Sequence, residues 1–243
     1  MILNDEDKLL LSKAKDKSHI SETKSYPTFI GFLNEHQKTL LENNFDSNRL
    51  TFYGGYENPI RVILGFNAEI SDFKISSIKF SYKQEYELSH RDILGTLMSL
   101  GIQRDVIGDI LVFSGYSVVF LKDEIVPLVL NEVNKIKNVG VKTEIVKSEH
   151  FVRDDKFEDL VLSVSSFRLD VIVSSICSLS RDKSNKLINS ELVNVNYFIE
   201  TNNSSVLKIG DIITIRKFGK FVLSENLGIS KKGKFRILIK HYI

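Results

Sequence analysis

The sequence contains one cysteine, Cys177, which excludes an internal disulfide and a zinc site built from several thiolates. Long apolar runs are also missing. The best run, ILVFSGYSVVFL at residues 110–121, falls short of the roughly 20 apolar residues that a membrane-spanning helix needs, and it indicates buried strands. The amino terminus, MILNDEDKLLLSKAKDK, lacks the basic start and long apolar core of a secretory signal. We therefore expect a cytoplasmic protein with no membrane partner.

The composition, 42% hydrophobic and 26% charged over 243 residues, is typical of folded, soluble protein with two or three domains. The net charge of +2 conceals an uneven distribution. Residues 168–243 carry 13 Lys and Arg against 6 Asp and Glu, whereas the rest of the chain has an acidic excess. A basic surface that binds a polyanion is therefore expected in the carboxyl-terminal third.

The pattern upstream of this third predicts an α+β fold. The first 45 residues look helical, and the strands RLTFYGGY (49–56) and IRVILGF (60–66) follow, separated by a turn at Asn58-Pro59. Then come a strand at 75–82, a helix at 88–100, short strands near 110–113 and 117–120, a helix near 124–137, and strands at 139–146 and 159–166. We expect an N-terminal α+β domain at 1–74 and a central sheet domain at 75–162, with an exposed acidic connection at 148–159.

The segment SFRLDVIVSSICSLSRDKSNKLINSELVNVN (166–196) predicts two short helices. Leu169, Ile172, Val173 and Ile176 fall on one apolar face of the first, and Ser180 can cap the second. The hairpin then presents cations outward from this apolar seam; they are Arg168, Arg181, Lys183 and Lys186.

Downstream, LKIGDIITIRKFGKF (207–221) predicts two strands in which basic and aromatic residues alternate. Arg216, Lys217 and Lys220 suit phosphate contact, and Phe218 and Phe221 suit either base stacking or the core.

These segments together resemble the S4 RNA-binding domain, found in a small-subunit ribosomal protein, tyrosyl-tRNA synthetases and many RNA-modifying enzymes. The resemblance implies an S4 domain at 165–243 that binds structured RNA through its first two helices and the adjoining strand. The binding positions that it implies are Arg168, Ser180, Arg181, Lys183, Lys186 and Lys208. Tyr197 departs from the pattern, which has glycine after Val-Asn.

Three further stretches, LTFYGGYENPIR (50–61), SHRDILGTLMSLGIQRDVIGDI (89–110) and LGISKKGKFRI (227–237), resemble the YlmH-type S4-domain proteins of bacteria. The resemblance implies a central domain similar to the RNA-recognition fold (RRM). It also implies association with rRNA, and with peptidyl-tRNA, on obstructed large ribosomal subunits in translation quality control, with a link to cell division. We expect a monomer that does not bind DNA.

In the central domain, Arg91 and Arg104 lie at opposite ends of one helix-turn in a chain that uses lysine far more often than arginine. They are candidates for RNA contacts, because a planar guanidinium binds phosphate in a bidentate manner. The alternative is a pair of structural ion pairs with nearby aspartates.

An enzyme is the main competing interpretation. Arg168-Leu169-Asp170 matches the catalytic triplet of pseudouridine synthases, but it lies within the helical pattern, which favours a structural Asp170 that caps or pairs. His90-Arg91-Asp92 imitates a kinase catalytic loop without the other kinase motifs. We therefore predict no catalytic residue, no metal and no cofactor. An S4-targeted RNA-modifying enzyme and a cell-division adaptor remain the alternatives.

Overall fold

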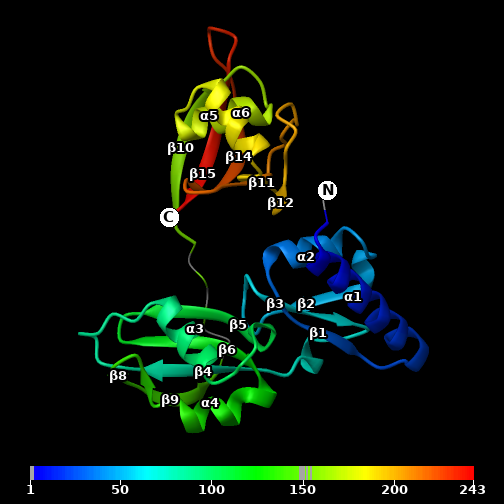
Figure 1. The fold of residues 1–243 in the computed structure, drawn as a ribbon, viewed down its shortest axis with the longest axis vertical. Helices are drawn as coiled ribbons and strands as arrows, with labels where there is room; N and C mark the ends of the chain where they lie inside the picture. Colours follow the sequence, from blue (N-terminus) through cyan, green and yellow to red (C-terminus); the bar gives the residue numbers. More distant parts are fainter. Residues whose placement is uncertain (1–2, 148–150, 152, 154) are drawn as a thin grey trace. The chain divides into compact units, whose positions relative to one another are not determined.

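The computed structural model of the chain describes residues 3–147, 151, 153 and 155–243 (Figure 1). The chain forms two compact units, one comprising Asp5–Arg153 and the other containing Asp154–Ile243. Each combines helices with antiparallel sheets, so the fold class is α+β, as predicted. Of the acidic connection expected at 148–159, residues 148–150, 152 and 154 lie outside the described residues.

The first unit begins with a small three-stranded sheet in the order β1-β3-β2. Its elements are α1 (Asp5–Lys24), β1 (Thr28–Leu33), α2 (Glu35–Glu42), β2 (Leu50–Tyr53) and β3 (Val62–Phe66). Asp5, Glu6 and Asp7 place negative charge in the first turn of α1, where the helix dipole favours it. The two helices cover the sheet, and Ala14, Leu41 and Leu64 lie in their shared core.

Strand β1 differs from the continuous helical pattern expected over the first 45 residues. Phe29, Phe32 and Leu33 belong to this strand, which pairs with β3. Gly31 of this strand has no room for a side chain, since a Cβ atom there would lie 2.4 Å from the carbonyl oxygen of Asp105. The strand therefore approaches another backbone more closely than any larger residue allows.

A second sheet in the same unit has the order β5-β6-β4-β9. Its elements are β4 (Ile75–Ser81), α3 (His90–Ser99), β5 (Ile107–Phe113), β6 (Tyr116–Lys122), α4 (Val126–Glu132) and β9 (Lys142–Val146). This βαββαβ order is that of ferredoxin-like and RNA-recognition folds. Helices α3 and α4 cover one face of the sheet, where Phe80, Ile93 and Val129 are buried. Helix α4 is shorter than the predicted 124–137, because Val133 leaves helical geometry ahead of the small hairpin of β7 (Lys135–Ile136) and β8 (Val139–Gly140).

The second unit is a six-stranded sheet in the order β10-β15-β14-β13-β11-β12, with two helices packed on one face (Figure 1). Its elements are β10 (Phe157–Val164), α5 (Leu169–Cys177), α6 (Arg181–Asn189), β11 (Val193–Val195), β12 (Phe198–Ile199), β13 (Ile212–Ile215), β14 (Gly219–Ile229) and β15 (Phe235–Tyr242). Strand β10 begins before residue 162, the expected end of the central domain, and it pairs along its whole length with β15. The strand before the helix pair is thus part of the sheet on which the pair rests.

Candidate nucleic-acid interface

The helix pair α5–α6 is the element on which the sequence placed its basic surface. Helix α5 ends at Ser178, which has a left-handed backbone (φ 52°), and α6 begins after Ser180. The Ser180 hydroxyl accepts a hydrogen bond from the backbone N–H of Lys183 at 3.4 Å, which confirms the predicted N-cap. The hydroxyl of Ser184 donates to the carbonyl of Asp170 at 3.1 Å and joins the two helices. A short turn and two serines therefore fix how the helices lie.

Asp170 binds both arginines of the pair. Its side chain is only 3% exposed. Its carboxylate accepts two hydrogen bonds from Arg168, at 3.0 and 3.1 Å, and one from Arg181 Nε at 3.2 Å. It also accepts a hydrogen bond from the backbone N–H of Val171 at 3.0 Å. The structural interpretation of this aspartate matches its position: it pairs within the helical hairpin and orients two guanidinium groups.

Electrostatics keep Asp170 ionised. Burial alone would raise the pKa of its carboxyl group, but the hydrogen bonds and charge of Arg168 and the charge of Arg181 lower it below its usual value. The same pairing raises the pKa of Arg168. A carboxylate held in this way positions the arginines and has no open side from which it could attack a substrate.

The other cations predicted on this surface lie beside the two arginines or on the same helix. Arg168 and Arg181 have side chains that are 40% and 59% exposed, and Lys183 and Lys186 are exposed on α6. Lys208 is exposed two residues after Val206, which forms a β-bridge with Arg168. The structure thus brings Lys208 to the start of α5, some 40 positions away in the chain from Arg168.

The remaining predicted cations of this unit lie elsewhere. Arg216 and Lys217 are exposed in the turn between β13 and β14. Lys220 lies on the face of the sheet opposite the helices, because its neighbour Phe221 is buried in the core beneath them. Phe221 is thus a core residue, whereas Phe218 is 39% exposed in the turn.

In the first unit, Arg104 is half-buried and binds the backbone. Its Nη1 donates to the carbonyls of Ile107 and Gly108, at 2.8 and 3.3 Å, where β5 has a bulge. Burial lowers the pKa of its guanidinium. This placement favours the structural alternative for Arg104, although carbonyl groups take the place of the expected carboxylates.

Arg91 is exposed in the first turn of α3, and its neighbour Asp92 completes a capping box with Ser89. Asp92 also forms an ion pair of 2.7 Å with Lys137. The bond to Lys137 and those to Ser89 lower the pKa of Asp92 to about 2. The kinase-like His90-Arg91-Asp92 triplet is thus the start of a helix.

Arg61, from the GGYENPIR segment, joins three parts of the first unit, a role that its local sequence does not reveal. Its guanidinium donates to the carbonyls of Phe32, Arg104 and Ile107 at 2.8, 3.0 and 3.0 Å. Burial, followed by the charge of Arg104, lowers its pKa to about 10, so the group stays charged at neutral pH. This segment is one of the three that resemble YlmH-type proteins, and its Arg61 links β1 of one sheet to β5 of the other.

The sheet face on which an RNA-recognition fold stacks bases is covered in this chain. Tyr56 stacks on Phe120 of β6 with the ring centroids 4.4 Å apart, and its hydroxyl donates to buried Asp109 at 2.7 Å. Phe32 and Phe73 join the same cluster, in which Phe120 is fully buried. Phe120 is therefore not available for stacking with an unpaired base, whereas Phe113 and Tyr116 at the ends of β5 and β6 are half-buried.

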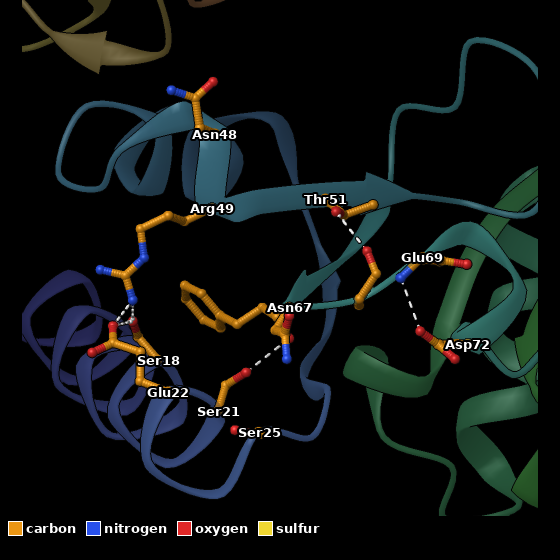
Figure 2. Close-up of a pocket in the computed structure, with 12 residues that line it drawn as sticks. Ser18, Ser21, Glu22, Ser25, Asn48, Arg49, Thr51, Asn67, Glu69 and Asp72 are labelled. Atoms are coloured by element: carbon orange, nitrogen blue, oxygen red, sulfur yellow. Dashed lines mark hydrogen bonds and ion pairs between the residues drawn. The ribbon is translucent and has the colours of Figure 1, made fainter.

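A polar pocket of about 690 Å³ lies in the N-terminal part of the first unit, between α1 and the β2–β3 strands (Figure 2). Arg49 reaches across it to form an ion pair with Glu22 and a 2.7 Å hydrogen bond to Ser18 on α1 (Figure 2). Ser21 donates to the carbonyl of Phe66 at 3.1 Å. These polar groups bind one another across the pocket, which therefore joins the helix to the sheet. The residues that line the pocket are spread over positions 18 to 72, so no local sequence motif predicts it.

No group of His, Cys, Asp and Glu suited to a metal ion occurs among the residues that the structure describes. In that same part of the chain, no helix is long and apolar enough to cross a membrane. Burial raises the pKa of the Cys177 thiol to about 11, which makes it a poor nucleophile at neutral pH.

Three matches to known proteins bear on the function. Residues 68–150, which include the β4–β9 sheet, match the family described as "Putative RNA-binding domain in YlmH". A Bacillus subtilis (strain 168) protein named "Ribosome-associated protein quality control protein P2" is 31% identical over 203 residues, covering 77% of this chain and 76% of that protein. The solved structure of "Cell division protein ylmH from Streptococcus pneumoniae" is similar with a TM-score of 0.50 and 28% identity, over 60% of this chain and 94% of that one.

Proposed function

Because the chain belongs to the YlmH family of RNA-binding proteins, we propose that it binds structured RNA on the large ribosomal subunit and acts in ribosome-associated quality control. The relative from Bacillus subtilis carries that role in its name, and its similarity extends over three quarters of both chains. The site of action is the cytoplasm, the RNA is rRNA together with peptidyl-tRNA, and the protein binds as a monomer.

The observation that supports this proposal is the pair of arginines held by Asp170. Two guanidinium groups in fixed positions bind phosphates at a smaller entropic cost than flexible side chains do. Lys183 and Lys186 extend the positive charge along α6, and Lys208 adds to it beside Arg168. We assign this surface to an S4 domain that reads the shape of folded RNA.

The proposed role is binding without catalysis. A nucleophile must reach the reacting base, but Asp170 is buried and bound by two cations. These contacts favour a structural role for Asp170 over the role of a catalytic nucleophile in a pseudouridine synthase.

Charge reversal on α6 tests the proposal. Arg181 is unsuitable for this purpose, because a glutamate there would face the buried Asp170 and destabilise the helix pair. Lys183→Glu combined with Lys186→Glu changes two exposed side chains instead. A matched control reverses exposed Lys13 and Lys15 on α1 and so alters the net charge equally.

The measurement is binding of each full-length variant to purified large subunits over a series of salt concentrations. We expect the α6 variant to lose at least tenfold in affinity and to show a salt slope flatter by about 1.5 to 2, because two phosphate contacts are lost. The α1 variant should bind as the wild type does. Equal loss in both variants would reduce the effect to net charge and refute the proposed surface.

A further inference from the structure

The sheet of the second unit has a second face, opposite α5 and α6, that the proposed function does not use. Alternation along the strands places Phe221, Ile237 and Ile239 under the helices and the residues between them on the other side. We call this other side the outer face; its cations, aromatic residues and central apolar residue are Phe157, Val161, Lys220, Arg236, Lys240 and Tyr242. Two carboxylates share this face, because Asp159 is the cross-strand partner of Lys240 and Glu225 is that of Leu238. Val161, in the middle of the edge strand β10, is 53% exposed, so the outer face is open along this edge.

Lysines and aromatic rings alternate across one end of the outer face. The ammonium group of Lys220 lies 4.6 Å from the ring centre of Tyr242 and 5.1 Å from that of Tyr197. Lys240 lies 5.6 Å from the ring centre of Phe157, and the rings of Phe157 and Tyr242 are 4.5 Å apart. These contacts hold the ammonium groups in place at the surface of the sheet. The cluster spans β14, β15, β10 and the β11–β12 turn.

Tyr197 occupies its place in the cluster at a conformational cost. It follows Asn196 in the two-residue turn between β11 and β12, and both have positive φ angles, 48° and 73°. Turns of this type favour Asn-Gly, because glycine adopts such angles without steric strain. A tyrosine kept in this conformation, with its ring under Lys220, indicates that the aromatic side chain has a use.

The opposite end of the outer face leads into a basic hairpin tip. Residues 230–234 form a closed loop, in which the Ser230 and Gly233 N–H groups donate at 2.7 and 2.9 Å to the carbonyls of Lys234 and Ser230. The loop carries Lys231, Lys232 and Lys234, and Arg236 follows on the outer face. Within the described part of the chain, no carboxylate lies in ion-pair contact with these four cations.

We propose that the outer face and the hairpin tip form a second RNA-binding surface, which takes an unpaired RNA strand. The exposed ring of Phe157 and the half-buried rings of Tyr197 and Tyr242 lie next to fixed cations. Such a combination suits unpaired bases and their phosphates, whereas a helical RNA offers no bases for stacking. Arg236 to Tyr242 extends over about 20 Å at roughly 3.4 Å per residue, which accommodates several nucleotides. The proposal rests on the proposed function in that it assumes an RNA partner, but it assigns a different RNA form to a different face.

The test uses the full chain and two labelled RNAs, a blunt-ended hairpin and an unstructured 12-nucleotide strand. Two outer-face variants are compared with the α6 variant, namely Tyr197→Gly combined with Tyr242→Ala, and charge reversal of Lys231, Lys232 and Lys234. Reversal of Lys13, Lys15 and Lys24 on α1 is the matched control for the second variant.

We expect each outer-face variant to bind the unpaired strand at least tenfold more weakly and to keep its affinity for the hairpin. The tip variant should also flatten the salt slope for the strand by about 2, since each phosphate contact to a single strand contributes about 0.7. The α6 variant should show the opposite pattern, with the hairpin lost and the strand retained. If only the proposed function is wrong, the wild-type chain should bind the hairpin weakly and still bind the unpaired strand.

Tyr197→Gly by itself provides a readout independent of folding defects. The glycine relieves the positive-φ strain, so the melting temperature should not fall, while strand binding weakens. A photocrosslinking side chain at Val161 should become attached to the unpaired strand and not to the hairpin. The proposal is overturned if all variants bind the strand like the wild type, or if the tip lysines are needed for binding to anionic phospholipid vesicles instead.

Discussion

At the residue scale, one buried carboxylate decides how the helix pair presents its charge. Asp170 binds Arg168 and Arg181 simultaneously, and both guanidinium groups remain partly exposed. Arg61 has the corresponding role in the first unit, where it donates to three carbonyl groups. In each case one charged side chain binds groups from several parts of its unit and holds them in place.

Asp170→Asn should lower the stability of the second unit by about 1 to 3 kcal/mol, because a charged acceptor of several hydrogen bonds is lost. The pairing lowers the folded-state pKa of Asp170, so its stabilisation is present above the unfolded-state value of roughly 3.9 and is lost as the pH falls through the folded-state value. Urea unfolding of residues 155–243 at pH 7 and in the acid range measures both effects. The enzyme interpretation would be supported instead if Asp170→Asn left the urea midpoint at pH 7 unchanged and the full-length variant caused the loss of a modified nucleoside from the RNA.

At the scale of the elements, the amphipathic patterns predicted most of the fold. The apolar spacing of residues 169–176 and the Ser180 cap led directly to α5 and α6, and alternation identified β4, β5 and β6. The strand β1 escaped prediction because it is fixed by pairing with β3, which is distant in the sequence. For the same reason, sequence alone could not show that Lys220 is on the opposite face from Lys183, since this depends on which strand neighbour is buried.

The GGYENPIR segment shows how a recognisable motif can be structural. A Cβ atom on Gly54 would lie 2.4 Å from Pro59 Cβ and 2.5 Å from the carbonyl oxygen of Arg61, whereas one on Gly95 of α3 would meet nothing within 4 Å. Gly54→Ala should therefore destabilise the first unit by about 1 to 3 kcal/mol. Gly95→Ala should stabilise it by about 0.5 to 1 kcal/mol, because alanine is the better helix former. Thermal unfolding of both variants checks this, and a destabilising Gly95→Ala would contradict the described packing of α3.

At the scale of the whole molecule, the two units contribute different properties. The first unit covers the centre of the base-stacking face of its RNA-recognition sheet with Tyr56, which stacks on Phe120. The second unit carries the basic excess of the chain and exposes cations on the helix pair, on the outer face and at the hairpin tip. The family relationship assigns RNA binding to the chain, and the basic excess of the second unit makes this unit the favoured site for it.

The most direct test of the central claim is crosslinking of the protein to RNA in cells, with the attachment points mapped on both partners. The account predicts that crosslinked peptides include residues 168–186 and that the attached RNA comes from the large ribosomal subunit or its bound tRNA. Crosslinks confined to residues 5–153, or attached RNA without any ribosomal or transfer RNA, would contradict it.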